Sequence, residues 1–184
     1  MPLKTAPPPE VDQPLGMYWK LWRVLAVLAA LAIALFWIWI FTGGPKKANP
    51  DRLDDRAYVS RTEDRCQQLL VDLNALPPAQ DSKTATARAD VLDQANGMVS
   101  KMVGTIEADA PRTGDDGKSL RLWFADWHTY LQDREDFADR LRTNPDAKFL
   151  LSENAELKDS VDKTIEVFAD VNDMPDCATP GDVG

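Results

Sequence analysis

Few residues of this sequence are of types that carry out chemistry. His128 is the only histidine among the 184 residues, and Ala125 stands three positions before it, so the Glu-x-x-His pairs of a di-iron bundle are absent. A zinc centre lacks ligands for the same reason. Asp109, Asp115 and Asp116 could supply oxygens to calcium, but they lack the ligand spacing of an EF-hand. We therefore predict no catalytic, cofactor-binding or metal-binding residues, no cofactor, no enzyme activity, and a surface position for His128.

The two cysteines, Cys66 and Cys177, are the other reactive side chains. Cys66 falls on the apolar seam of a predicted helix, and Cys177 follows the last predicted helix. If the first and last helices of the domain lie side by side, the residues before Cys177 are long enough to bring the sulfurs together. A disulfide would close a loop of 111 residues and stabilise the domain by about 4 to 5 kcal/mol in the chain-entropy model. The alternative is two unrelated thiols, as expected in a cytosolic domain.

Two polar residues, Asn96 and Arg134, occupy positions where the helical pattern calls for apolar groups. Burying either side chain requires hydrogen-bond or charge partners. One interpretation is that Asn96 sets the register of its helix while Arg134 reaches a surface acid. The other is that the two residues line a small polar pocket between helices.

The longest apolar run extends from Val24 to Phe41 and contains no charged, amide or hydroxyl side chain. As a helix, this run with Leu21 and Trp22 would span roughly 30 Å, the thickness of the hydrocarbon core of a bilayer. We predict a transmembrane anchor over residues 18–42. The alternative, a cleaved signal peptide, is disfavoured because the run is long and Pro45 is a poor residue after a cleavage site, so we predict a retained signal anchor.

Tryptophans flank the apolar run and are predicted to lie at headgroup depth as membrane-interface anchors. These residues are Trp19, Trp22, Trp37 and Trp39. Basic residues stand on both sides of the run, and their count alone mildly favours an N-terminus outside, so the rule is ambiguous in this chain. Long domains translocate largely regardless of charge, and both cysteines lie after the run. We therefore predict a single-pass protein of the plasma membrane with a cytoplasmic N-terminus and an extracytoplasmic C-terminal domain. The absence of an Asn-x-Ser/Thr sequon favours a bacterial envelope.

The remainder of the chain has a helical pattern and predicts an all-α fold, in which the transmembrane helix is followed by an antiparallel four-helix bundle. Apolar seams predict helices over residues 51–76, 85–110, 120–141 and 146–174, the last with a break near Ser152. Asn49-Pro50-Asp51 and Asn144-Pro145-Asp146 predict the starts of the first and fourth helices. The predicted organisation is a disordered proline-rich tail (1–17), the anchor (18–42), a linker (43–50), the helical bundle domain (51–174) and a C-terminal tail (175–184) that the disulfide could tether.

Charge and aromatic content narrow the function. The 18 basic and 28 acidic residues after Thr42 give a net charge of −10, which argues against nucleic-acid binding.

Trp123, Trp127 and Tyr130 make the third helix unusually bulky and are a candidate interaction face. We predict a protein-interaction module or accessory subunit of a membrane complex, whose partners are the lipid bilayer and another membrane or envelope protein. The alternatives are a ligand-sensing bundle that acts through a separate membrane partner and, less favoured, an anchored enzyme. The sequence does not determine whether the chain forms homo-oligomers.

Overall fold

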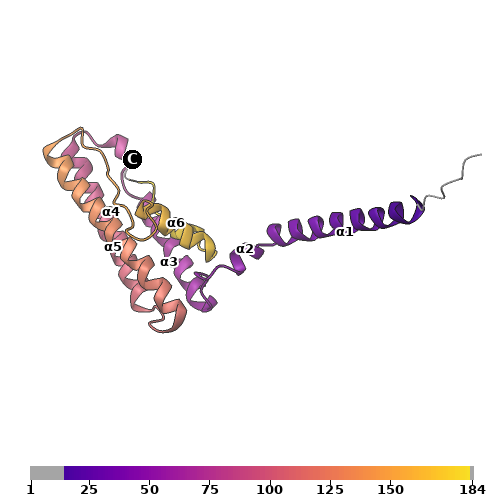
Figure 1. Ribbon diagram of the computed structural model, residues 1–184. Helices are drawn as coiled ribbons and strands as arrows, with labels where there is room; N and C mark the ends of the chain where they lie inside the picture. Colours follow the sequence, from indigo (N-terminus) through magenta and orange to yellow (C-terminus); the bar gives the residue numbers. More distant parts are fainter. Residues whose placement is uncertain (1–14, 183–184) are drawn as a thin grey trace, which may run out of the picture. The chain divides into compact units, whose positions relative to one another are not determined.

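The computed structural model describes residues 15–182 of an all-α protein (Figure 1). The chain divides into two compact units, residues 1–45 and residues 46–184, and we call the second the helical unit. The predicted all-α class with one N-terminal apolar helix is confirmed. Most of the expected proline-rich tail lies outside the described residues, but Leu15, Gly16 and Met17 already belong to the first helix.

The first unit is formed mainly by α1 (Leu15–Phe41), a continuous helix of 27 residues. Its stretch Trp19–Phe41 is long and apolar enough to cross a membrane, and its described side chains are almost all exposed within the unit. Apolar side chains along a whole helix need an apolar environment, which a bilayer provides. The helix ends before Gly43, whose φ of +75° lies in the left-handed region where glycine is unstrained. A single turn, α2 (Gly44–Lys47), follows.

The helical unit contains three long helices, α3 (Arg56–Asn74), α4 (Ala85–Ala108) and α5 (Gly114–Thr143). A 3₁₀ turn, η1 (Ala79–Asp81), lies in the link that follows α3. Side chains cap two of the helices: Asp55 accepts a hydrogen bond from the Tyr58 amide, and Thr84 accepts one from the Ala87 amide. The buried residues of all three helices follow the apolar seams expected from the sequence. Helix α4 packs on both α3 and α5 (Figure 1).

The fourth helix is much shorter than expected. Helix α6 (Val161–Val171) has 11 residues and packs on α5, and the turn η2 (Pro175–Cys177) packs on α3 and α6. Residues 144–160 are not helical, and Leu150 and Leu157 of the predicted seam are exposed. The predicted helix 146–174 is therefore wrong in its first half. Asp133 of α5 accepts hydrogen bonds from the amide and hydroxyl of Ser152, and such bonds hold the segment in a non-helical conformation.

Both Asn-Pro-Asp sequences form turns instead of helix starts. The Asn49 side chain accepts a hydrogen bond from the Asp51 amide at 2.8 Å, and Asn144 does the same with Asp146 at 3.1 Å. This Asx turn uses the same acceptor as a helix cap, but the chain need not continue as a helix. The linker consequently extends beyond residue 50, and α3 begins only at Arg56.

The linker is fastened to the end of α6 by Asn172. The Asn172 side chain accepts from the Leu53 amide at 2.8 Å and donates to the Asp51 carbonyl at 3.1 Å. Arg52 donates to the Val171 carbonyl at 2.7 Å. Because Asn172 and Leu53 are buried, these bonds make residues 51–53 part of the packed helical unit.

Candidate functional site

The structure brings Cys66 of α3 and Cys177 of η2 together. Their sulfurs lie 2.03 Å apart, at disulfide distance, and the Cα atoms are 5.1 Å apart. Both residues are buried. Next to the pair, the Glu63 side chain accepts a hydrogen bond from the Asp176 amide at 3.2 Å. The tail that follows α6 is therefore tied to α3, as the positions of the cysteines in the sequence allowed.

The predicted interaction face at Trp123, Trp127 and Tyr130 is wrong, because the exposed fractions of these residues are only 2%, 0% and 2%. Trp123 stacks on Phe168 of α6 with ring centroids 5.1 Å apart and donates to the Ile165 carbonyl at 3.3 Å. The sequence pattern suggested more bulk than four helices could cover. The non-helical segments supply the missing cover: the ring of Phe149 meets that of Tyr130 edge-on at 6.0 Å, and the Tyr130 hydroxyl donates to the Pro180 carbonyl at 3.3 Å.

The tryptophans expected at the membrane interface are exposed on α1. They are Trp19, Trp22, Trp37 and Trp39. Trp37 stacks on Phe41 with centroids 5.7 Å apart, and Trp39 stacks on Phe36 at 6.3 Å. Their position at headgroup depth stays a prediction.

The residues considered for chemistry in the sequence are dispersed on the surface. His128 is exposed, and its Nε2 lies 3.0 Å from a carboxylate oxygen of Glu107. The three acids considered for calcium have separate partners: Asp109 pairs with Arg65, Asp115 pairs with Lys118, and Asp116 accepts from the amides of Asp54 and Asp55. Within residues 15–182, no cluster of three or more His, Cys, Asp or Glu residues could hold a metal ion.

Arg134 and Asn96 do meet, in a buried polar centre between α4 and α5. The Arg134 side chain has no exposed area, and its Nε donates to the side-chain oxygen Oδ1 of Asn96 at 2.7 Å. Its two terminal nitrogens donate to the two carboxylate oxygens of Asp182 at 2.6 and 2.8 Å. This forked arrangement is the strongest pairing geometry available to arginine. Sequence reasoning found Arg134 and Asn96 but missed Asp182.

The electrostatics of this centre follow from its burial. Burial alone would lower the pKa of Arg134, but the hydrogen bonds and charge of Asp182 outweigh it and leave the pKa above its ordinary value. Burial raises the pKa of the Tyr130 hydroxyl, although nearby Arg134 opposes this shift. The Asn96 Nδ2 donor is buried and has no hydrogen-bond partner among the described residues. A cation with an unused amide donor beside it is suited to holding an anion.

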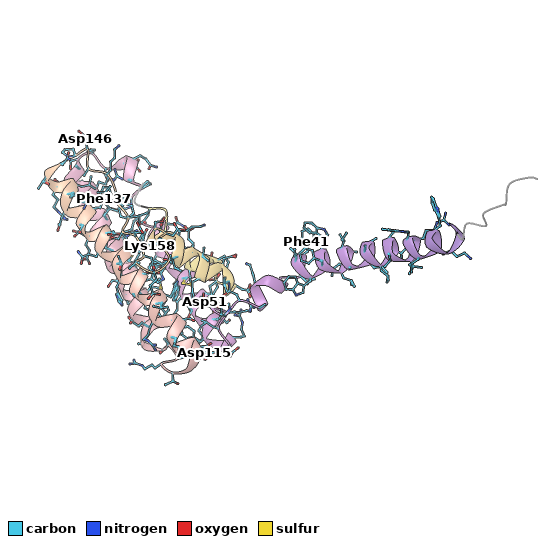
Figure 2. All side chains as sticks on the ribbon, viewed as in Figure 1. Phe41, Asp51, Asp115, Phe137, Asp146 and Lys158 are labelled. Atoms are coloured by element: carbon cyan, nitrogen blue, oxygen red, sulfur yellow. A yellow bond between two sulfur atoms is a disulfide. The ribbon has the colours of Figure 1, made fainter. Side chains whose placement is uncertain are left out.

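A groove runs between α5, α6 and the loop before α6, with a volume of about 450 Å³. Leu122 and Val167 line it with exposed fractions of 55% and 49%, and the exposed Leu157 lies on the loop side. The acids that line the groove are Asp51, Asp126, Glu156 and Asp159, against one cation, Lys163. The groove therefore combines exposed apolar side chains with a lining of net negative charge. Figure 2 labels Asp51 and Lys158, which lie at the two ends of α6.

Internal hydrogen bonds shape this groove. Asp126 of α5 accepts from the Thr164 hydroxyl at 2.6 Å and from the side-chain Nδ2 of Asn154 at 2.7 Å. The side-chain oxygen Oδ1 of Asn154 in turn accepts from the backbone amides of Glu156 and Leu157, both at 2.9 Å. These bonds hold Leu157 outward in an ordered loop, so its exposure is a property of the fold.

The contacts of Asp173 predict a pH dependence of linker docking. Hydrogen bonding from Arg52, at 2.7 Å, is the largest cause of a lowered pKa at Asp173, and the charges of Arg56 and Lys46 add to it. A carboxyl with a lowered pKa in the folded state stabilises that state above its unfolded pKa, and the contribution is lost as the pH falls through the folded value. We expect Asp173→Asn to cost at most about 1 kcal/mol at pH 7, because Asp173 is half exposed.

The cost of Asp173→Asn should shrink as the pH falls below the ordinary value of 3.8. Urea unfolding at pH 7 and pH 3 measures this difference. Asp146→Asn is the matched control, since Asp146 is exposed and has no ion pair within the described residues (Figure 2). An equal cost at both pH values would contradict the assignment of the shift to the ion pair.

Comparisons with protein-family models, with curated proteins and with solved structures found no match. The function therefore has to be inferred from this chain's own residues. Two places offer more than structural packing: the groove between α5 and α6, and the polar centre at Arg134.

Proposed function

We propose that the chain is a single-pass protein of a bacterial plasma membrane, with its N-terminus in the cytoplasm and its helical unit outside. In this proposal, α1 is the retained anchor, and the helical unit, an antiparallel four-helix bundle with one short helix, binds another protein of the membrane or envelope. The observation that carries the proposal is the groove between α5 and α6, which exposes Leu122, Leu157 and Val167 together. Exposed apolar groups gathered in one groove and rimmed by polar residues are typical of binding surfaces.

The chemistry of the groove indicates the kind of partner. Glu156, Asp159 and Asp51 outnumber the single cation Lys163, and the helical unit is acidic as a whole. An amphipathic segment that presents apolar side chains on one face and lysine or arginine beside them would match both properties. The apolar run ends at Phe41, and only four residues separate it from Lys46, the first residue of the helical unit. We therefore expect the partner to lie in or on the same membrane.

Site-specific photocrosslinking in intact cells tests this proposal. A photoreactive phenylalanine analogue at Leu122 or at Val167 should capture the same protein. Val71 on α3 is the matched control position, because it is apolar, 59% exposed and outside the groove. Capture that is equally efficient from Val71, or adducts only between copies of this chain, would contradict the proposal.

A second experiment tests whether the acids of the groove contribute to binding of the captured partner. Changing both Glu156 and Asp159 to lysine should reduce copurification of that partner at least tenfold, because the basic segment would lose its counter-charges. Both side chains are exposed, so the folded state should be nearly unaffected. Copurification that does not respond to this change, or to salt, would mean that the capture is incidental.

The extracytoplasmic location has support in the cysteine pair. Disulfides persist in oxidising compartments and are rare in the cytosol. Ligand sensing through a separate membrane partner is the second candidate, and the polar centre at Arg134 favours it. An anchored enzyme finds no support among the described residues, where the lone histidine is exposed and paired with Glu107.

A further inference from the structure

The polar centre at Arg134 has the composition of a carboxylate-binding site. Arg134 is fully buried and presents a planar fork of donors, which the Asp182 carboxylate fills with two bonds of 2.6 and 2.8 Å. Asn96 holds the guanidinium from behind at Nε, and its own Nδ2 is a buried donor without a partner in the described part of the chain. The donors of Arg134 are therefore occupied by the Asp182 carboxylate, while the neighbouring Asn96 Nδ2 donor is unused.

A cavity of about 260 Å³ opens next to the carboxylate of Asp182. Its walls come from α3, α4 and the link between them, and they combine apolar side chains such as Leu73, Leu76 and Leu92 with polar groups. Arg88 of α4 also lines the cavity, and its guanidinium lies over the Phe137 ring, 5.6 Å from the ring centroid. An apolar cavity of about 150 Å³ holds benzene, so this cavity has room for an alkyl chain of five or six carbons.

Within residues 15–182, the segment that carries the carboxylate in the fork makes few hydrogen bonds, and Pro180 in this segment is buried. Asp182 belongs to the C-terminal tail, five residues after Cys177, and its side chain is 26% exposed while Arg134 is fully buried. Between these two points the tail is bonded through the Pro180 carbonyl, at 3.3 Å from the Tyr130 hydroxyl, and through a 3.4 Å contact of Thr179 with Glu166. The buried Arg134 guanidinium thus requires a negatively charged partner. Asp182 supplies this charge from a short segment at the edge of the site.

We propose that Arg134 and Asn96, with the adjoining cavity, form a binding site for a small organic carboxylate that carries an apolar chain, and that Asp182 is its internal occupant. The carboxylate of the ligand takes the place of the Asp182 carboxylate on Arg134, and its chain lies in the cavity. Binding displaces the tail after Cys177 and leaves the disulfide intact. The site therefore couples a soluble ligand to the position of the C-terminal tail, and this holds whether or not the groove between α5 and α6 binds a partner.

Competition with the tail sets the expected affinities. A segment tethered five residues away has an effective concentration in the millimolar range or higher. Removing its carboxylate in Asp182→Ala removes this competition, so the ligand should bind the variant at least tenfold more tightly than the unchanged protein.

The test uses full-length protein in detergent and sodium hexanoate as the probe. In Asp182→Ala, hexanoate should raise the melting temperature in a saturable manner. Hexanol, which has the chain without the carboxylate, should not, and acetate, which has the carboxylate without the chain, should require at least tenfold more. The double variant Arg134→Met with Asp182→Ala should not respond. In the unchanged protein, hexanoate should speed the release of C-terminal residues by a carboxypeptidase, and hexanol should have no such effect.

Two results would overturn the proposal. If hexanoate does not stabilise Asp182→Ala, or if hexanol acts equally, Asp182 is only a structural partner of Arg134. If Asp182→Ala does not fold, the unchanged protein decides, and a rate of C-terminal digestion that is the same with and without hexanoate rejects the site.

Discussion

Asp182→Ala should destabilise the helical unit more than Arg134→Met, although Asp182 is the more exposed member of the pair. Losing Asp182 leaves a fully buried guanidinium without a counter-charge. Losing Arg134 leaves a carboxylate that is 26% exposed on the tail and can turn toward water. Breaking a buried ion pair is costly mainly through the charge that stays behind, so the location of the remaining charge decides the order of the two variants.

The expected costs are roughly 3 kcal/mol for Asp182→Ala and roughly 1 to 2 kcal/mol for Arg134→Met, where methionine fills part of the arginine's space but the buried Asn96 oxygen loses its donor. Adding Arg134→Met to Asp182→Ala should therefore recover part of the lost stability. Urea unfolding of the full-length protein, followed by tryptophan fluorescence, measures all three variants, since Trp123 and Trp127 are buried in the same core.

Asp176→Ala is the matched control for this cycle, because it removes another acid close to the tail without touching Arg134. It should cost less than about 0.5 kcal/mol, as expected for a substitution away from a buried network. If Arg134→Met costs as much as Asp182→Ala, or if the double variant is less stable than Asp182→Ala, the buried cation is not the origin of the effect.

Helical periodicity was sufficient to predict that α3, α4 and α5 exist and which faces they bury, but α3 begins five residues after the predicted residue 51 and α5 begins six residues before the predicted residue 120. Val59, Cys66 and Leu69 of α3 are buried as the seam predicts, and so are Val99 and Ile106 of α4. Each of these helices is long enough for its apolar period to repeat several times, and burial of a continuous stripe then determines the packing. The apolar helix α1 was predictable for a simpler reason, because the length and composition of its sequence meet the requirement for a membrane span without any knowledge of tertiary contacts.

The segment between α5 and α6 was not predictable from the same pattern. Leu150 and Leu157 continue the apolar spacing, yet both are exposed. The deciding interactions are long-range: Asp126 and Asp133 of α5 bind Asn154 and the Ser152 amide. A sequence pattern contains the apolar period but not the acceptors that another helix offers to a loop, so local propensity was overridden by tertiary contacts.

The buried polar centre was half predictable. Arg134 and Asn96 each interrupt an apolar seam, and that signal correctly indicated that the two residues need partners. The main partner, Asp182, lies 48 residues after Arg134 on a segment with no secondary-structure pattern. The position of Cys177 was the available clue, because a disulfide to α3 brings the following tail against the helices and places an acid within reach.

Removing the disulfide by Cys66→Ala with Cys177→Ala should cost about 2 to 5 kcal/mol, the usual range for loss of a native bridge. The bridge closes a loop of 111 residues, so most of the helical unit lies between the two cysteines. When the bridge is removed, this loop gains chain entropy in the unfolded state. A loss of 3 kcal/mol corresponds to a drop in melting temperature of roughly 10 °C for a unit of this size.

The same change should also weaken the hold of Asp182 on Arg134. The covalent anchor at Cys177 keeps the carboxylate near the guanidinium, and without it the effective concentration of the tail falls. Thermal unfolding of the unchanged protein with and without a reductant, beside the double alanine variant, measures the stability, and carboxypeptidase digestion measures the tail. Reduced protein and the alanine variant should then melt at the same lowered temperature and lose C-terminal residues faster than oxidised protein.

A reductant that leaves both measurements unchanged would mean that the two sulfurs are not bonded in solution. A lowered melting temperature with unchanged digestion would mean that the contacts of Tyr130 and Arg134 hold the tail without the bridge.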